Sequence, residues 1–185
     1  MTSEVKAQAQ QQMEAAITAV RTRLGKLRTG KASPAILDGI RVEYYGAQTP
    51  LNQLATIAVP EPRLLAVKPF DRTAIAEIEK AIQASNLGLN PANDGMMIRI
   101  PIPELTEERR REFTKVAKDI GEEGKVAVRH ARQEGNDKLK KLDKEGGVSE
   151  DELHQVKTEI QKLTDRFCGE IDEIVKSKEA EIMEI

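Results

Sequence analysis

The most constraining feature of this sequence is a long amphipathic stretch between Thr106 and about Lys144. Small and apolar residues recur in it at alternating steps of four and three, the spacing of a helix that packs against other helices. A single helix cannot bury such a face alone, so the chain must supply helical partners for it. We expect the packing face to comprise Phe113, Ala117, Ile120, Gly124, Ala127 and Ala131.

A second face of the same predicted helix is basic. At about 100° per residue, five cationic side chains fall within about 60° of one another. We call this row the basic ridge, and we interpret it as a nucleic-acid contact surface. A solvated face of a bundle held by salt bridges is an open alternative, since charge-rich helices commonly have one. The basic ridge consists of Arg111, Lys118, Lys125, Arg129 and Arg132.

Two further helices are predicted near 3–28 and 149–184. Ser3 is placed to cap the first, and Gly30 followed by Pro34 ends it. Ser149 and Glu152 form a capping box at the start of the last helix. Both segments repeat apolar residues at helical spacing: Met13, Ile17, Val20, Leu24 and Leu27 in the first, and Leu153, Val156, Ile160, Leu163, Phe167, Ile171, Ile174 and Ile182 in the last.

The intervening residues have the periodicity of strands. Residues 40–46 alternate between apolar and polar side chains, and 56–59 and 64–68 are β-rich runs around a Pro-rich turn. Asp71 can cap a helix that continues to about Ser85, and 96–100 predicts a last strand.

The predicted architecture is therefore α+β, an elongated three-helix bundle with a small domain inserted between its first and second helices. Residues 1–29 and 106–185 form the bundle, and 30–105 form the inserted α+β domain. Two short crossings join the domains, and glycine and proline nearby favour bending there. We predict hinges at Thr29, Gly30 and Lys31, and at Glu104 and Leu105.

Composition restricts the classes of function. Aromatic residues make up 3% of the chain, so base stacking is not the expected main binding mode. A lone Cys168 allows no internal disulfide, no apolar run is long enough to span a membrane, and the N-terminus lacks the apolar region of a signal peptide. We expect a cytoplasmic protein without membrane contact.

Catalytic and nucleotide-binding motifs are not convincing here. The segment from Gly25 to Ala32 is one residue short of a phosphate-binding loop, because Ala32 replaces the magnesium-binding hydroxyl residue, and it lies between a helix and a proline. The two histidines, His130 and His154, fall on predicted helix surfaces without a nucleophile signature. We expect no enzyme activity, no cofactor and no metal.

At several places the residues resemble the ribosome recycling factor family, and the resemblance extends along nearly the whole chain. Six stretches carry it: Leu27–Ala35, Val42–Gly46, Thr49–Ala55, Leu87–Pro91, Leu105–Arg110 and Glu159–Asp165. The family's characteristic RNA-contacting helix is similar to Val126–Gln133, where Arg129 and Arg132 match, whereas His130 and Gln133 depart from the usual Asn and Arg.

The resemblance implies an L-shaped, tRNA-like molecule with a β/α/β second domain. It implies binding to the large ribosomal subunit and its rRNA after termination, followed by subunit splitting with elongation factor G and GTP. We expect a monomer, with rRNA contacts from Arg132, Arg129, Lys125, Lys118, Arg111 and Arg28. The rival class is an adaptor whose long helices bind only protein, and a pull-down of ribosomes rather than one discrete protein would separate the two.

Overall fold

The computed structural model describes residues 1–184, which divide into two compact units. Unit 1 comprises Met1–Leu27 and the chain from Glu108 onward, and unit 2 comprises Arg28–Glu107. Each unit has a hydrophobic core of its own. One unit is helical and the other contains the strands, so the predicted α+β class is confirmed.

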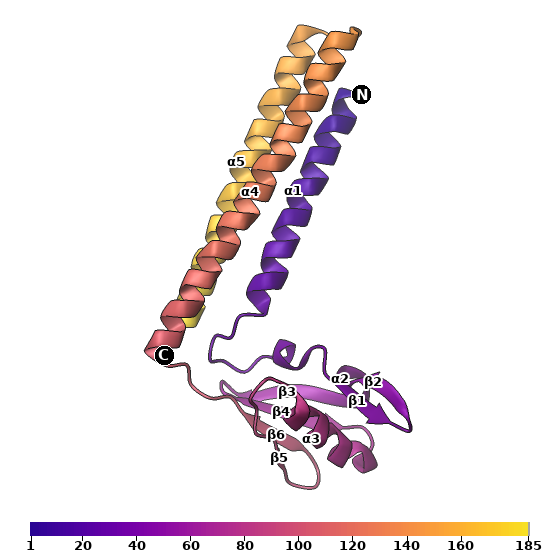
Figure 1. Ribbon diagram of the computed structural model, residues 1–185, viewed down its shortest axis with the longest axis vertical. Coiled ribbons are helices and arrows are strands. Elements are labelled where there is room, and N and C mark those ends of the chain that lie inside the picture. The colour runs from indigo at the N-terminus through magenta and orange to yellow at the C-terminus, as the bar shows by residue number, and fades with distance from the viewer. Residues whose placement is uncertain (185) are drawn as a thin grey trace. The chain divides into compact units, whose positions relative to one another are not determined.

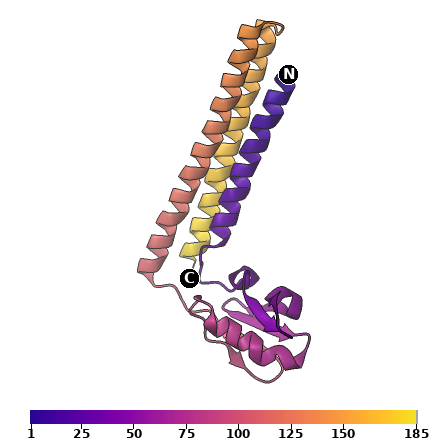
Figure 2. The same ribbon diagram turned by 45° about the vertical axis from the view of Figure 1, so that its right-hand side comes forward.

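Unit 1 is a bundle of the three long helices (Figures 1 and 2). They are α1 (Thr2–Gly25), α4 (Glu107–Glu145) and α5 (Glu150–Met183). Both views show α4 and α5 running antiparallel and α1 lying alongside them. No helix in residues 1–184 is both long enough and apolar enough to cross a membrane.

The sequence predicts the N-terminal cap of α5 correctly but that of α1 incorrectly. Ser149 caps α5, because its Oγ accepts a hydrogen bond from the Glu152 amide at 3.3 Å. The predicted Ser3 cap is wrong, because α1 already begins at Thr2 and Met1 is its N-cap residue. Thr2 is buried and its hydroxyl donates to the Glu152 carboxylate of α5, so tertiary packing carries the helix past Ser3.

The packing face of α4 differs from the expected one at a single position. Phe113, Ala117, Ile120, Gly124 and Ala131 do contribute to the interior. Ala127, however, is exposed, and Val128 is fully buried in its place. The inward row continues through Gly135 and Leu139 at helical spacing, so the four-residue step falls after Gly124 and not after Ala127.

Two glycines let the helices of the bundle approach closely. A Cβ on Gly124 would overlap a methyl group of Val20 in α1, and a Cβ on Gly121 would overlap Val175 in α5. Since side chains in protein interiors are close-packed, these positions have no room for a methyl group without local movement.

Unit 2 contains two antiparallel sheets. A hairpin pairs β1 (Arg41–Tyr44) with β2 (Ala47–Pro50). The larger sheet has the order β3-β4-β6-β5. Its strands are β3 (Ala55–Glu61), β4 (Leu64–Pro69), β5 (Ala92–Asn93) and β6 (Ile98–Pro101).

Three helical segments complete unit 2. They are a 3-10 helix at Pro34–Leu37, the short α2 (Leu51–Leu54) and α3 (Ile75–Ala84). Strand β6 alternates between buried and exposed residues, as expected for a sheet covered on one face. The fully buried side chains of the core come from β1, β4, β6 and α3, together with the 3-10 helix and α2: Val42, Leu65, Val67, Ile78, Ile82, Ile98, Ile100, Leu37 and Leu51.

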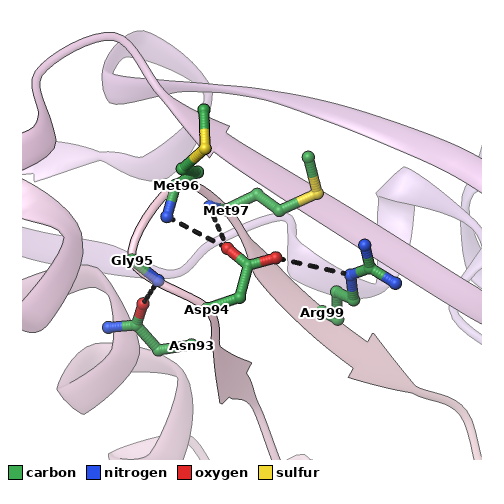
Figure 3. A network of polar contacts seen from close by, with 6 residues as sticks. All are labelled: Asn93, Asp94, Gly95, Met96, Met97 and Arg99. Atoms are coloured by element: carbon green, nitrogen blue, oxygen red, sulfur yellow. Dashed lines mark hydrogen bonds and ion pairs between the residues drawn. The ribbon is translucent and has the colours of Figure 1, made fainter.

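Carboxylates hold the turns of unit 2. Asp71 Oδ1 accepts from the Thr73 amide at 2.9 Å and caps a 3-10 turn, Arg72–Ala74, which leads into α3. In the β5–β6 hairpin, Asp94 Oδ1 accepts from the amides of Met96 and Met97 at 3.0 and 2.9 Å (Figure 3). Such side-chain bonds stabilise a turn without requiring a regular ladder.

Candidate nucleic-acid interface

The basic ridge follows the edge of α4 that faces α5. Lys118 Nζ lies 3.6 Å from Glu179, and Lys125 Nζ lies 2.9 Å from Asp172. Arg132 donates to Gln161 Oε1 at 3.2 Å. These α4 residues are seven apart and meet progressively earlier residues of α5, as antiparallel packing requires. The ridge is therefore partly a contact row between two helices.

Lys125 is the most occupied member of the ridge. Its side chain is only 16% exposed, and it also contacts Glu122 at 2.6 Å. The hydrogen bond to Glu122, followed by that to Asp172, raises the pKa of Lys125 above its usual value. Two carboxylates already compensate the charge of Lys125, so it should bind a phosphate more weakly than its neighbours do.

Arg129 is the most available member. Its side chain is exposed, and within residues 1–184 no hydrogen bond or ion pair holds it. Its positive charge acts on the nearby Cys168, although burial outweighs that effect and raises the pKa of the Cys168 thiol. An exposed guanidinium without a carboxylate partner can bind a phosphate with two parallel hydrogen bonds.

Arg132 is half-buried and positioned by a neutral partner. Gln161, which accepts from Arg132, donates its own amide to Asp165 Oδ1 at 2.9 Å. The neutral amide of Gln161 orients the Arg132 guanidinium without neutralising its charge, because the Asp165 carboxylate hydrogen-bonds to Gln161 and not to Arg132. Arg129 and Arg132 thus lie one helical turn apart with much of their charge uncompensated.

The two positions that depart from the family pattern lie on the same stretch. His130 is exposed, and its Nδ1 lies 3.6 Å from Glu134. Gln133 donates to Asp137 at 3.1 Å. Both contacts are made within α4, so neither residue draws on another helix.

The remaining predicted contact residues are dispersed. Arg111 is exposed near the start of α4. Arg28, by contrast, belongs to unit 2, where its guanidinium donates to the Leu87 carbonyl oxygen. The structure thus brings Lys118, Lys125, Arg129 and Arg132 together along one helix edge, and it separates Arg28 from them by unit.

The acidic row of α5, two members of which contact the ridge, was missed by reading α4 alone. Asp165, Asp172 and Glu179 are seven residues apart in α5, matching the spacing of Lys118, Lys125 and Arg132. That matched repeat of opposite charge was the signal available in the sequence, because antiparallel helices with complementary heptads align such rows.

The predicted hinge residues lie inside unit 2. Gly30 has a φ of 79°, and a Cβ placed there would lie 3.7 Å from Leu105 Cγ, so the two predicted crossings run close together. Glu104 forms an ion pair with Arg63. Nearby, the Ala32 amide donates a hydrogen bond to the Pro62 carbonyl oxygen at 2.7 Å, and the Ile102 amide donates to the Arg63 carbonyl oxygen at 2.8 Å. Both crossings are therefore tied to the turn between β3 and β4.

The side chains that metal binding or nucleophilic chemistry would use are also placed by the structure. Among residues 1–184, no group of three or more His, Cys, Asp or Glu side chains could hold a metal ion. His130 and Cys168 are the reactive side chain types nearest the ridge, and the raised thiol pKa of Cys168 disfavours its nucleophilic form.

Comparison with known proteins shows which family this chain resembles over its length. The family model described as "Ribosome recycling factor" matches residues 20–183. Ribosome-recycling factors of Shouchella clausii and Bacillus subtilis are 56% and 55% identical to this chain, and each alignment covers all of both proteins.

Two solved structures are also similar over the whole chain. A solution structure of the ribosome recycling factor has a TM-score of 0.80 and 39% identity, and the match covers 98% of it. Another comes from models of the T. thermophilus ribosome recycling factor and the E. coli elongation factor G bound to the E. coli post-termination complex, with a TM-score of 0.68, 46% identity and full coverage. With the helical bundle, the β-containing unit and these matches in agreement, the chain belongs to the ribosome recycling factor family.

Proposed function

We propose that this protein binds the post-termination ribosome and, with elongation factor G and GTP, splits it into subunits for a new round of translation. The observation that carries the proposal is the full-length match to ribosome-recycling factors at more than half identity. A related factor has been placed together with elongation factor G on a post-termination complex. The same assembly is the natural one for a chain of the same length and fold.

The contact with the large subunit is assigned to the basic ridge. Arg132 and Arg129 bind rRNA phosphates, and Lys118 and Arg111 extend the row along α4. Lys125 contributes least, since Glu122 and Asp172 already hold it. Arg28 is retained as a contact from unit 2, although its bond to Leu87 uses part of its donor capacity. Arginine suits this role because it binds phosphate bidentately.

The protein acts as a monomer in the cytoplasm and has no catalytic step of its own. GTP is hydrolysed by elongation factor G, and this chain transmits the resulting motion. Unit 2 turns relative to the bundle at the two chain crossings, and the predicted hinge residues Thr29–Lys31 and Glu104–Leu105 lie on the unit 2 side of them. Glycine at position 30, with its positive φ, supports the assignment of one joint.

Binding to purified large subunits at several salt concentrations tests the ridge. Arg132→Ala should weaken binding most, about tenfold, and Arg129→Ala somewhat less, as expected for a lost charge-assisted bond. Each should also reduce the salt dependence of binding, because one phosphate contact is lost. Thermal stability should change by less than about 0.5 kcal/mol, as for other surface substitutions.

Matched variants make the ridge test specific. Lys141→Ala removes an exposed cation from α4 on a different face and should leave binding unchanged. Arg129→Lys and Arg132→Lys keep the charge but lose bidentate geometry, and they should give intermediate affinities. Wild-type affinity in the Arg132→Ala, Arg129→Ala double variant would reject the assignment of the ridge to rRNA.

The joint is tested by restraining it. A protein in which the two units are covalently crosslinked should still bind ribosomes but should split them more slowly with elongation factor G and GTP. Splitting at the wild-type rate by fully crosslinked protein would show that rotation of unit 2 is not required.

A further inference from the structure

Aspartate followed by glycine occurs twice in this chain, at Asp38–Gly39 and at Asp94–Gly95. This pair isomerises spontaneously, because glycine has no Cβ to hinder attack by its own amide nitrogen. The nitrogen attacks Cγ of the protonated aspartyl carboxyl group, an N–Cγ bond forms, and the carboxyl hydroxyl leaves with the amide proton as water. Water then opens the succinimide at either carbonyl, giving back aspartate or giving isoaspartate, in which the main chain runs through the former side chain.

The two Asp–Gly sites have the same backbone conformation and the same access to solvent. Gly39 and Gly95 have φ values of 86° and 87°. A Cβ placed on either glycine would meet no atom within 4 Å, and both aspartates are exposed. Steric access and hydration therefore do not distinguish the sites, so a difference in reactivity must come from the hydrogen bonds of the reacting groups.

Hydrogen bonds hold both reacting groups of Asp94–Gly95 (Figure 3). The nitrogen that would attack, the Gly95 amide, donates to Asn93 Oδ1 at 2.8 Å. The Asp94 carboxylate accepts from the amides of Met97 and Met96, which lower its pKa and so leave less of the neutral, reactive carboxyl form. A guanidinium lies 3.6 Å from the other carboxylate oxygen. We call the residues that hold these groups the hairpin network: Asn93, Met96, Met97 and Arg99.

Asp38–Gly39 has no such restraint on its reacting groups. Within residues 1–184, neither the Asp38 carboxylate nor the Gly39 amide makes a hydrogen bond or an ion pair. Asp38 bonds only through its backbone amide, which donates to the Ala35 carbonyl oxygen at 3.2 Å and takes no part in the reaction. The carboxyl group can therefore turn toward the Gly39 nitrogen without breaking a contact, whereas ring closure at Asp94 must first break several.

We propose that Asp38–Gly39 is a modification site at which the folded protein forms isoaspartate, and that the hairpin network protects Asp94–Gly95 from the same reaction. Isoaspartate at position 38 adds one carbon to the main chain between Leu37 and Ile40, whose side chains are both in the core of unit 2. The Ile40 amide donates to the Leu37 carbonyl oxygen across this turn at 3.3 Å, and the longer main chain disrupts that bond. Ageing at this site should therefore weaken unit 2 and spare the bundle. The inference is independent of the proposed function, since it rests on the chemistry of the folded chain alone.

Prolonged incubation of the full-length folded protein at neutral pH tests the proposal. Isoaspartate at each site is measured after proteolysis by electron-transfer mass spectrometry, which distinguishes it from aspartate. It should accumulate about tenfold or more faster at Asp38 than at Asp94, because breaking even one hydrogen bond to a charged group slows a reaction by that factor. In the chain unfolded by urea, the two sites should react at similar rates. Equal rates in the folded protein, or a faster rate at Asp94, would overturn the proposal, as would no isoaspartate at Asp38 once the unfolded chain has accumulated it.

Two variants separate the free site from the protected one. Asp38→Glu keeps the exposed charge but does not form a succinimide, so aged protein should keep the hydrogen-exchange protection of unit 2 that aged wild type loses. Asn93→Ala removes the acceptor of the Gly95 amide and should speed isomerisation at Asp94 without changing it at Asp38. Asn90→Ala, which truncates an exposed asparagine outside the hairpin network, is the matched control. An unchanged rate at Asp94 in Asn93→Ala would refute the protective role of the network.

Discussion

The two units use charged residues in different ways. In unit 1, ion pairs connect helices far apart in the sequence, such as Lys6 with Glu159 at 2.7 Å and Lys125 with Asp172 at 2.9 Å. In unit 2, the carboxylates of Asp71 and Asp94 accept hydrogen bonds from residues two or three positions away. Charged residues thus connect separate helices in unit 1, whereas in unit 2 they order turns and add a few longer-range contacts, such as Arg63 with Glu104.

This difference affects which surfaces remain for partners. Rows of charge along long helices leave some members, notably Arg129, without a compensating carboxylate, and such members can bind a polyanion. A unit whose carboxylates are used in turns has no comparable cationic row, and its exposed residues of note are aromatic. The comparison explains why we assign most of the rRNA contacts to unit 1, with Arg28 as the one contact proposed from unit 2.

The largest effects are expected from substitutions that remove core volume from one unit at a time, which test whether the two units are stabilised separately. Ile78→Ala in unit 2 and Ile171→Ala in unit 1 each truncate a fully buried side chain and should cost about 2–5 kcal/mol. Because each unit has its own core, hydrogen exchange should report the loss mainly in the unit that carries the change. Equal loss of protection in both units would show that they unfold as one.

A smaller effect is expected where helices approach closely. Gly124→Ala should stabilise an isolated helix by about 1 kcal/mol but overlap Val20 in the bundle, for a net loss of about 1–3 kcal/mol. Gly169→Ala, in α5 where a Cβ meets nothing within 4 Å, is the matched control and should be neutral or stabilising. Thermal unfolding followed by circular dichroism measures both, and a Gly124→Ala protein as stable as the control would contradict the packing argument.

Variants of Lys125 and Arg129 compare a cation that is held by carboxylates within the bundle with one that is free to bind RNA. Lys125→Ala should lower stability by about 0.5–1 kcal/mol, because it removes a partly buried cation between two carboxylates, yet it should weaken ribosome binding less than Arg129→Ala. Arg129→Ala should show the opposite pattern. Thermal unfolding and affinity for the large subunit should be measured for both variants. A larger binding defect in Lys125→Ala than in Arg129→Ala would show that Lys125 is the more important rRNA contact.

The stability of unit 2 should depend on acidic pH through the carboxylates of Asp71 and Asp94. Hydrogen bonds from Thr73 lower the pKa of Asp71, and amide bonds from Met97 and Met96 lower that of Asp94. A carboxyl with a lowered folded-state pKa stabilises the fold above its unfolded pKa, and that contribution is lost as the pH falls below about 4 through the folded value.

Asp94→Asn tests this linkage at one turn. The variant should reduce the dependence of unit 2 stability on pH between about 2 and 5 while changing it little in unit 1. Unit 1 has its own such group in Glu159, whose pKa is lowered chiefly by Lys6, and Glu159→Gln is the reciprocal change. The expected shifts in melting temperature are small, and an unchanged pH profile in Asp94→Asn would remove the role given to this turn.

Some elements followed directly from local sequence. The three long helices were predictable because apolar residues repeat at helical spacing over many turns, and Ser149 caps α5 as its capping box indicated. Strands β3, β4 and β6 were recognisable from β-branched runs. Strand β2, Ala47–Pro50, was not, since its residues have little strand preference and pair because the Tyr45–Gly46 turn folds them back on β1.

The sequence by itself also determined the position of the basic ridge, because helical geometry places residues at fixed angles on α4. Only the tertiary structure decided which of these cations remain available. The antiparallel register of α4 and α5 sets Asp172 against Lys125 and a neutral Gln161 against Arg132, and it leaves Arg129 without a carboxylate. The same packing turned Val128 inward in place of Ala127. Charge along one helix is a local property. The matched heptads of α4 and α5 indicate that the two charged rows face each other, but only the packing decides that Arg132 meets Gln161 and not Asp165.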